Sequence, residues 1–228
     1  MINHMRGEPT KGYDECPMPV HDFILDPVVL SFFQKGGTGA VLDLGCGYGL
    51  FGCLLRFERN FKGTLIGLDA YAPYMEKMKK YSGAVYDSFV IADARYLPFK
   101  NGAVDIVLAS EIIEHLHKND GYRLIEEAER VCRALVLITT PRGHIPQERR
   151  SKNDLEAHHS GWSERDFAAR GYGVIYAGSV QMMVQKSRLK GLIGPVNAAL
   201  GLMPEVLRKK LPKYELVAFK ELGMKGTE

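Results

Sequence analysis

The amino-acid sequence predicts an α/β fold built on an open, mostly parallel sheet, and three observations support this. Short apolar runs of strand length recur along the chain, and stretches with apolar residues at helical spacing separate them. One of these runs breaks abruptly into alternating glycines. Strands and helices that alternate at these lengths form a sheet covered by helices. With 228 residues, the chain is long enough for one such domain with room for an insertion.

The first strand, over residues 40–44, leads directly into a Gly-x-Gly-x-Gly turn and then into a helix over residues 50–57. Glycines allow backbone angles that are closed to other residues, and they leave no Cβ between the chain and a ligand. The free N–H groups at the start of the helix point at the same place. This layout is typical of a nucleotide-binding crossover, although a plain strand-to-helix turn could use the same residues.

The second strand, over residues 63–69, ends in Asp69. In a sheet of this kind, an acid at the tip of the second strand accepts hydrogen bonds from ribose hydroxyls. Asp69 could instead cap the following helix. Because the glycine turn and the acid follow each other in the expected order, together they favour the binding of an adenosine-containing ligand.

The rest of the chain continues the alternation of strands and helices. We expect a helix after Asp26, with Pro27 at its first position, and further helices over residues 73–81 and 121–133. Further strands are expected over residues 85–91, 104–109, 134–140, 174–180 and 214–219. Ser110 can cap a helix that carries, on one turn, Glu111, Glu114 and His115. Ser163 begins another helix, and Asp166 completes a capping-box-like pair with it.

The composition is that of a cytoplasmic globular protein. A formal net charge of +3 is too small by itself to indicate nucleic-acid binding. The sequence shows neither a signal peptide nor an apolar run of transmembrane length. The four cysteines show no paired metal spacing and are expected to be reduced thiols: Cys16, Cys46, Cys53 and Cys132.

Two segments interrupt the alternation. Residues 1–20 are polar and contain prolines, and they form either a flexible arm or a lid over a site. Residues 181–213 interleave apolar side chains with Lys and Arg, and we expect an amphipathic helical insertion before the last strand. The insertion could alternatively offer a surface for a lipid-like substrate or for peripheral membrane contact. The main domain therefore consists of residues 1–180 and 214–228.

The chain from about residue 40 to residue 180 resembles the class I S-adenosylmethionine-dependent methyltransferases, of the methyltransferase type 11 kind. The resemblance is carried by the order of four motifs, which are Leu42 to Gly49, Gly67 to Asp69, Ala92 to Ala94, and Asp105 to Val107 leading to Glu114-His115-Leu116. It implies a Rossmann-like, seven-stranded, mostly parallel sheet with an antiparallel last strand and helices on both faces. It also implies S-adenosylmethionine as cofactor and S-adenosylhomocysteine as product.

The resemblance implies a role for each motif in holding the cofactor. Asp43 and the glycines after it would surround the methionine part, and Asp69 would bind the ribose hydroxyls. Asp93 would accept from the adenine amino group, and Ala94 would donate a backbone N–H to the ring. The cofactor-binding residues predicted in this way are Asp43, Gly45, Cys46, Gly47, Gly49, Asp69, Ala70, Asp93, Ala94 and Ser110.

Methyl transfer from a sulfonium is an in-line displacement, so the acceptor must be aligned and a hydroxyl acceptor must lose its proton. We predict His115 and Glu111 as the catalytic residues. The Glu-x-x-Glu-His spacing also resembles the metal site of the small-RNA 3′-end 2′-O-methyltransferases, in which a later histidine completes the ligand set. This alternative predicts Mg²⁺ or Mn²⁺ on Glu111, Glu114, His115 and His158. Glu-His-Leu at this position is also common in the family without any metal.

The sequence thus predicts a methyltransferase that acts on an oxygen of a small molecule, a sugar or a lipid precursor. A divalent-metal-assisted RNA 2′-O-methyltransferase is the first alternative, but the chain lacks an added RNA-binding domain and nucleic acid is the less favoured partner. A protein that binds S-adenosylmethionine without catalysing transfer is the second alternative.

Overall fold

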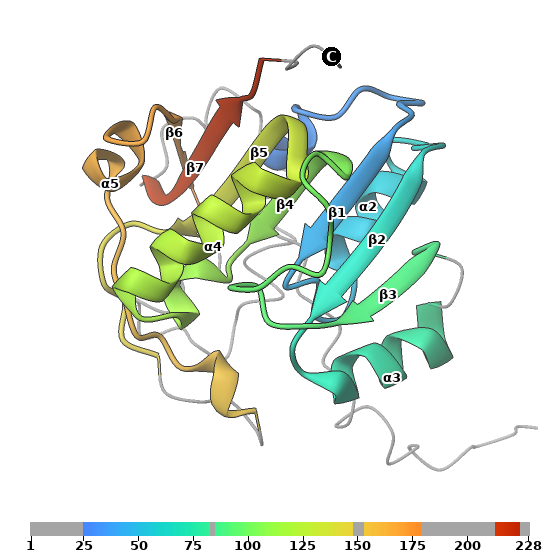
Figure 1. Ribbon diagram of the computed structural model, residues 1–228, viewed down its shortest axis with the longest axis horizontal. Coiled ribbons are helices and arrows are strands. Elements are labelled where there is room, and N and C mark those ends of the chain that lie inside the picture. The colour runs from blue at the N-terminus through green and yellow to red at the C-terminus, as the bar shows by residue number, and fades with distance from the viewer. Residues whose placement is uncertain (1–24, 83–84, 148–152, 179–212, 224–228) are drawn as a thin grey trace, which may run out of the picture.

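A seven-stranded sheet forms the centre of the molecule, with strand order β3-β2-β1-β4-β5-β7-β6 (Figure 1). The computed structural model describes residues 25–82, 85–147, 153–178 and 213–223. The strands are β1 (Ala40–Leu44), β2 (Thr64–Asp69), β3 (Ser88–Ile91), β4 (Val104–Ser110), β5 (Cys132–Pro141), β6 (Gly173–Gly178) and β7 (Lys213–Glu221). The first five strands are parallel, and β7 runs antiparallel between β5 and β6. The predicted mostly parallel sheet with an antiparallel last strand is confirmed.

Helices cover both faces of the sheet because alternate strand residues point to opposite sides. The helices are α1 (Leu25–Leu30), α2 (Leu50–Phe57), α3 (Ala72–Ser82), α4 (Lys118–Val131) and α5 (Glu164–Ala168), with short 3-10 helices η2 (Ile113–His115) and η3 (Asp154–Glu156). Val41 of β1 packs into a core shared with α1 and α2, whereas its neighbour Leu42 packs into a second core with α4 and α5. Figure 1 shows the two layers, with α4 in front of the sheet and α2 behind it.

The register of the central strands brings three chain segments together at one edge of the sheet. Leu44 at the end of β1 pairs with Leu68 of β2 on one side and with Ala109 of β4 on the other. The segments that leave these strands therefore begin side by side. Ligands bind at this edge in open α/β sheets, where the strand order reverses.

Two predicted helix starts were wrong. Ser110 does not cap a helix, because β4 extends through it and pairs it with Thr139 of β5. Glu111 follows with a positive φ of 52°, so it precedes η2 and does not share its turn. Asp26 lies inside α1 and is buried, because the helix already includes Leu25, which packs in the core.

Several element bounds differ by a few residues from those predicted. The third strand begins at Ser88 rather than at residue 85, and α4 begins at Lys118 rather than at residue 121. The predicted capping box between Ser163 and Asp166 at the start of α5 is confirmed. The predicted arm over residues 1–20, and all but the last residue of the insertion over 181–213, lie outside the described residues.

Among the described residues, no helix combines the length and the apolar character that crossing a membrane requires. Three cysteines fall in this part of the chain, and all three are free thiols: Cys46, Cys53 and Cys132.

Candidate functional site

A cavity of about 290 Å³ opens at the carboxyl ends of β1, β2 and β4. It is lined by eight residues that the sequence predicted for the site: Gly45, Gly47, Asp69, Ala70, Asp93, Ala94, Glu111 and His115. It is also lined by nine that were not predicted: Leu68, Tyr74, Ala92, Arg95, Ile112, Leu116, Asn153, Leu155 and Glu156. Segments far apart in the sequence therefore meet around one space.

The backbone geometry of the turn after β1 explains why glycines occupy it. Gly45, Gly47 and Gly49 have φ values of 75°, 51° and 83°, a region that favours glycine. A Cβ on Gly45 would lie 2.6 Å from Cδ1 of Ile112, and one on Gly49 would lie 2.4 Å from Sδ of Met78. Apart from Gly47 itself and its two chain neighbours, no described residue places an atom within 4 Å of a Cβ built on Gly47. Gly45 and Gly49 thus allow close packing, whereas Gly47 leaves its backbone open to the cavity.

Asp69 joins the tip of β2 to the glycine turn. Its Oδ2 accepts a hydrogen bond from the backbone N–H of Gly47 at 2.9 Å, and its Oδ1 accepts from that of Tyr71 at 2.8 Å. Burial raises the pKa of Asp69, while these backbone donors act in the opposite direction. The carboxylate lines the cavity, and beyond these backbone donors and a further one from Ala70 it retains lone-pair capacity for a ligand.

Asp43 lies beneath the glycine turn and does not line the cavity. The Tyr86 hydroxyl donates a hydrogen bond to its Oδ2 and accepts one from the backbone N–H of Gly52 at 3.1 Å. Burial raises the pKa of Asp43 to about 7. Asp43 is therefore placed to support the turn from below rather than to touch a ligand in the cavity.

Three other predicted cofactor residues also lie outside the lining. Cys46 is buried, with a thiol whose pKa is raised by burial. Gly49 begins α2 against Met78. Ser110 shares a hydrogen bond with Thr139, with the two hydroxyl oxygens 2.8 Å apart.

Asp93 forms an ion pair with the residue two positions along the chain. The Arg95 guanidinium donates to both Asp93 oxygens at distances of 2.7 to 3.0 Å, and it also reaches Asp120 of α4 at 2.9 Å. Hydrogen bonds from Arg95 lower the pKa of Asp93. The carboxylate at the predicted adenine position is thus anionic and fixed in orientation.

Two carboxylates follow β4, and consecutive threonines of β5 donate to them. Thr139 donates to Oε1 of Glu111 at 2.8 Å, and Thr140 donates to Oε2 of Glu114 at 2.9 Å. Glu111 lines the cavity, whereas Glu114 is buried behind it. Burial raises the pKa of Glu114 well above its usual range, and the nearby charge of Glu111 adds to this effect.

His115 and His158 pack edge to face, with ring centroids 4.7 Å apart. Nδ1 of His115 lies 3.2 Å from the carbonyl oxygen of Ala157, and Nδ1 of His158 lies 2.7 Å from that of Ile145. A carbonyl can only accept, so each Nδ1 carries a proton, and when the ring is neutral its lone pair lies on Nε2. Only His115 lines the cavity.

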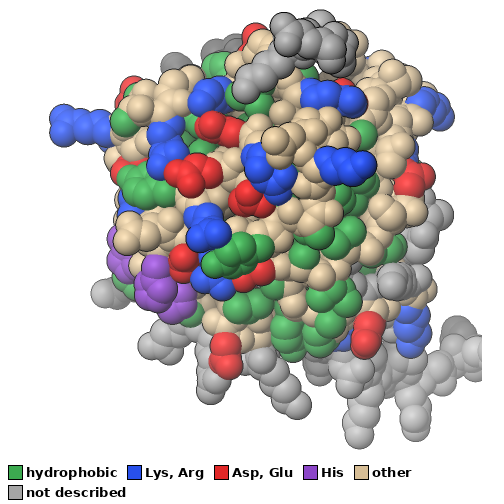
Figure 2. All heavy atoms as spheres, in the orientation of Figure 1, with side chains coloured by type: hydrophobic (Ala, Val, Ile, Leu, Met, Phe, Trp, Pro, Cys, Tyr) green, Lys and Arg blue, Asp and Glu red, His purple; other side chains and the backbone are tan. Residues whose placement is uncertain are grey.

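Three of the four residues of the predicted metal set come together. One ligand atom each from Glu114, His115 and His158 lies within 4.8 Å of the other two. Glu111 does not belong to this group, because its positive φ turns it away from η2 and its carboxylate accepts from Thr139. A second pair, His117 and His159, is exposed with ring centroids 4.7 Å apart, and histidines gather at one edge of the face shown in Figure 2.

The roof of the cavity comes from residues that the sequence did not indicate. Tyr74 of α3 and three residues around η3, namely Asn153, Leu155 and Glu156, follow no periodic pattern. Bridges from Arg142 and Gly143 to the buried Trp162 tie together the two ends of the segment that carries η3. The single tryptophan, in an otherwise polar stretch, was the one local signal that this segment is anchored.

Comparison with known proteins agrees with the fold. Residues 42–137 match the family model described as methyltransferase domain. A curated relative, an uncharacterized protein of Methanocaldococcus jannaschii, is 24% identical over 159 residues, which span 68% of this chain and 64% of the relative. The chain thus matches less than two thirds of that protein's length.

Solved structures show the same fold at low sequence identity. A protein of Pyrococcus horikoshii is 16% identical, with a TM-score of 0.57 and coverage of 87% of each chain. A SAM-dependent methyltransferase of Aquifex aeolicus is 15% identical, with a TM-score of 0.54 over 88% of this chain and 90% of the other. A phosphoethanolamine N-methyltransferase of Haemonchus contortus, solved with S-adenosyl-L-methionine, is 16% identical, with a TM-score of 0.56 over 88% of this chain and 52% of its own. Residues 42–137 thus match a methyltransferase domain model, and the solved structures share the fold of this chain.

Proposed function

We propose that this protein binds S-adenosylmethionine in the cavity and transfers its methyl group to an oxygen of a small molecule, a sugar or a lipid precursor. The observation that supports this most directly is that the four family motifs line one space: Gly45 and Gly47, Asp69 and Ala70, Asp93 and Ala94, and Glu111 with His115. The open backbone at Gly47 and the acceptor oxygens of Asp69 and Asp93 suit a ligand that carries amino and hydroxyl donors.

In this proposal, S-adenosylmethionine supplies an electrophilic methyl group on a positively charged sulfur. Asp69 orients the ribose, and Asp93, held by Arg95, orients the adenine. The acidic lining also favours a cationic ligand over a neutral product. Among the lining residues that the structure describes, the carboxylates are Asp69, Asp93, Glu111 and Glu156, and Arg95 is the only Lys or Arg.

His115 is the residue that best fits the role of proton acceptor. Its Nδ1 donates to the Ala157 carbonyl, so Nε2 is left with a lone pair. As the acceptor oxygen bonds to the methyl carbon and the carbon–sulfur bond breaks, the hydroxyl proton passes to Nε2. Glu111 lies beside it on the cavity wall and orients the acceptor hydroxyl or stabilises the charged imidazole.

The first test is a calorimetric titration of S-adenosylhomocysteine into the protein, which should show one site. Transfer of labelled methyl groups to a panel of hydroxylated acceptors then tests the chemistry. His115→Ala should keep the affinity and lose transfer, whereas the matched variant His117→Ala, on an exposed histidine two residues away, should keep both. Absence of S-adenosylhomocysteine binding would refute the proposed function, and full transfer by His115→Ala would refute the role of the imidazole.

A metal-assisted RNA 2′-O-methyltransferase is a second candidate, favoured by the convergence of Glu114, His115 and His158. Backbone carbonyls that hold Nδ1 of an imidazole, as they do here for both rings, are partners that metal-ligating histidines usually have. Two imidazoles and a carboxylate would hold Mn²⁺ or a similar ion beside the acceptor, where it would polarise a hydroxyl.

This candidate is tested by titrating Mn²⁺ into protein saturated with S-adenosylhomocysteine, and by repeating the titration with His158→Ala. One tight site that the variant loses would direct the search for acceptors to ribose hydroxyls at RNA 3′ ends. No heat in the wild-type protein would dismiss the metal and leave His115 as the proton acceptor.

A further inference from the structure

Glu156 lies in the roof of the cavity, on a backbone that is held in place. Oδ1 of Asn153 accepts from the N–H of Leu155 at 3.0 Å, which caps η3. Nε2 of Gln147 donates to the carbonyl oxygen of Glu156 at 2.9 Å. The Glu156 side chain therefore starts from a fixed position above the cavity.

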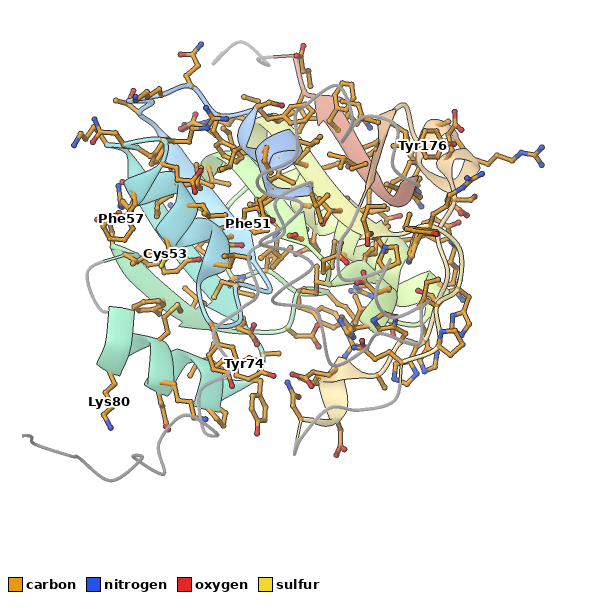
Figure 3. All side chains as sticks on the ribbon, turned by 180° about the vertical axis from the view of Figure 1, so that it is seen from behind. Phe51, Cys53, Phe57, Tyr74, Lys80 and Tyr176 are labelled. Atoms are coloured by element: carbon orange, nitrogen blue, oxygen red, sulfur yellow. The ribbon has the colours of Figure 1, made fainter. Side chains whose placement is uncertain are left out.

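The Glu156 side chain reaches across the roof to α3. Its Oε1 accepts a hydrogen bond from the hydroxyl of Tyr74, which also lines the cavity. The Tyr74 ring is itself held between Tyr48 and Tyr71, with centroids 4.4 and 4.9 Å away. Figure 3 shows Tyr74 at the N-terminal end of α3, on the side where the chain passes through η3. One carboxylate oxygen of Glu156 is thus satisfied and fixed.

The other oxygen, Oε2, is buried and accepts no hydrogen bond from any residue that the structure describes. A buried carboxylate oxygen without a donor is costly, and such atoms in a cavity wall commonly await a ligand or a water. Because Oε1 is committed to Tyr74, Oε2 is the atom through which Glu156 can receive a donor from the cavity.

Asp69 is a second carboxylate in the lining of the same cavity. Its pKa is raised mainly by burial, and the charge of Glu156 contributes to the same effect, so the two carboxylates face one space. Two acceptors that face each other across a small space suit two hydroxyl donors on adjacent carbons. Asp69 ends β2, and Glu156 contacts α3 through Tyr74, whereas Glu111 and His115 follow β4 on the other side of β1. The pair therefore belongs to the cofactor rather than to the acceptor.

Building on the proposed function, we propose that Glu156 is a second ribose-binding carboxylate. Its Oε2 accepts a hydrogen bond from one ribose hydroxyl of the cofactor, and Asp69 accepts from the other. Tyr74 acts as a positioning residue, because it touches the carboxylate of Glu156 through Oε1 and turns Oε2 toward the ribose. The segment that carries η3 thereby closes the cofactor site from above.

A double-mutant cycle between side chain and ligand tests this. The affinities of wild-type protein and Glu156→Gln are measured by calorimetry for S-adenosylhomocysteine and for its 2′-deoxy and 3′-deoxy analogues. Glu156→Gln should bind S-adenosylhomocysteine about tenfold or more weakly, because a hydrogen bond to a charged acceptor is lost. It should bind one of the two deoxy analogues as well as the wild-type protein does, because that analogue lacks the hydroxyl that Glu156 contacts.

Asp154→Asn is the matched control, because it removes the same charge from the same 3-10 helix at an exposed residue outside the cavity lining. It should bind all three ligands as the wild-type protein does. Glu156→Asp, which keeps the charge but retracts the carboxylate, provides a second variant if Glu156→Gln folds poorly, and it should show the same pattern.

Two results would overturn the assignment. Unchanged affinity of Glu156→Gln for S-adenosylhomocysteine would show that no ribose hydroxyl reaches Oε2. An equal loss for S-adenosylhomocysteine and both deoxy analogues would show that Glu156 acts elsewhere on the ligand or only on the fold. Failure of the wild-type protein to bind S-adenosylhomocysteine is a different result, and it would refute the proposed function itself.

Discussion

Replacing Asp43 with asparagine should stabilise the protein at alkaline pH and leave its stability at acidic pH nearly unchanged. Burial beneath the glycine turn raises the pKa of this carboxyl from 3.8 to about 7, although the hydrogen bond from Tyr86 acts in the opposite direction. In the unfolded chain the carboxyl ionises near its ordinary pKa. Between about pH 4 and pH 7 the folded state therefore holds a proton that the unfolded state has lost, and stability falls as the pH rises.

The magnitude follows from the two pKa values. The difference between 3.8 and about 7 corresponds to about 4 kcal/mol of unfolding free energy, lost progressively across that window. Asparagine does not ionise, so the difference in unfolding free energy between Asp43→Asn and wild type should grow by about this amount from pH 4 to pH 8. Urea denaturation of both proteins at several pH values measures it, because the other titrating groups cancel in the difference.

Tyr86→Phe is a control that should make stability depend more steeply on pH, whereas Asp43→Asn should remove that dependence. Loss of the donor raises the pKa of Asp43 further, so this variant should lose more stability at pH 8 than at pH 5. A difference between Asp43→Asn and wild type that does not change with pH would refute the reasoning, because it would mean that the buried carboxyl ionises as easily as one in water.

Three further variants test the cofactor site and its support. Asp69→Ala should weaken S-adenosylhomocysteine binding about tenfold or more, since hydrogen bonds to a charged acceptor contribute about 1.5–3 kcal/mol, and unchanged affinity in calorimetry would remove its ribose role. Gly47→Ala forces a side chain into a φ of 51°, so the unfolding free energy should fall by about 1 kcal/mol. The new methyl group also lies in the open space of the cavity, so cofactor affinity should fall as well. A variant that binds normally would show that the ligand does not approach this backbone. Gly121→Ala places a Cβ 2.4 Å from Cζ2 of the buried Trp162. This overpacking should lower the unfolding free energy by about 1–3 kcal/mol and therefore lower Tm by several degrees in a thermal scan. An unchanged Tm would show that the indole can shift.

The sequence predicted the sheet well because its signals are local. Each strand is an apolar run of the right length, and each glycine of the turn after β1 adopts a positive φ, which favours glycine at that position. The wrongly predicted helix start at Ser110 arose because hydrogen bonds to a distant strand outweighed a local preference. Ser110 has the chemistry of a helix cap, but its ladder pairing with Thr139 keeps it in β4, and this moves Glu111 out of the turn that His115 occupies.

The roof residues could not be predicted for a related reason. Glu156 and Tyr74 are 82 residues apart in the sequence, and neither belongs to a spacing pattern that indicates a site. Their meeting depends on how the segment before Trp162 crosses the cavity. Only the packed fold determines that path, because the bridges from Arg142 and Gly143 fix both of its ends.

The bridges from Arg142 and Gly143 to Trp162 determine how far the chain between them can change in length. The N–H of Gly143 donates to the carbonyl oxygen of Trp162 at 2.7 Å, so the intervening chain leaves and rejoins the sheet at nearly one point. The entropy of closing a loop grows only with the logarithm of its length, by about 0.6 kcal/mol for each doubling. The chain between these two anchors can therefore change in length at little entropic cost to the sheet, and the strands beneath can keep their register, as long as the residues that contact Tyr74 and His115 are retained.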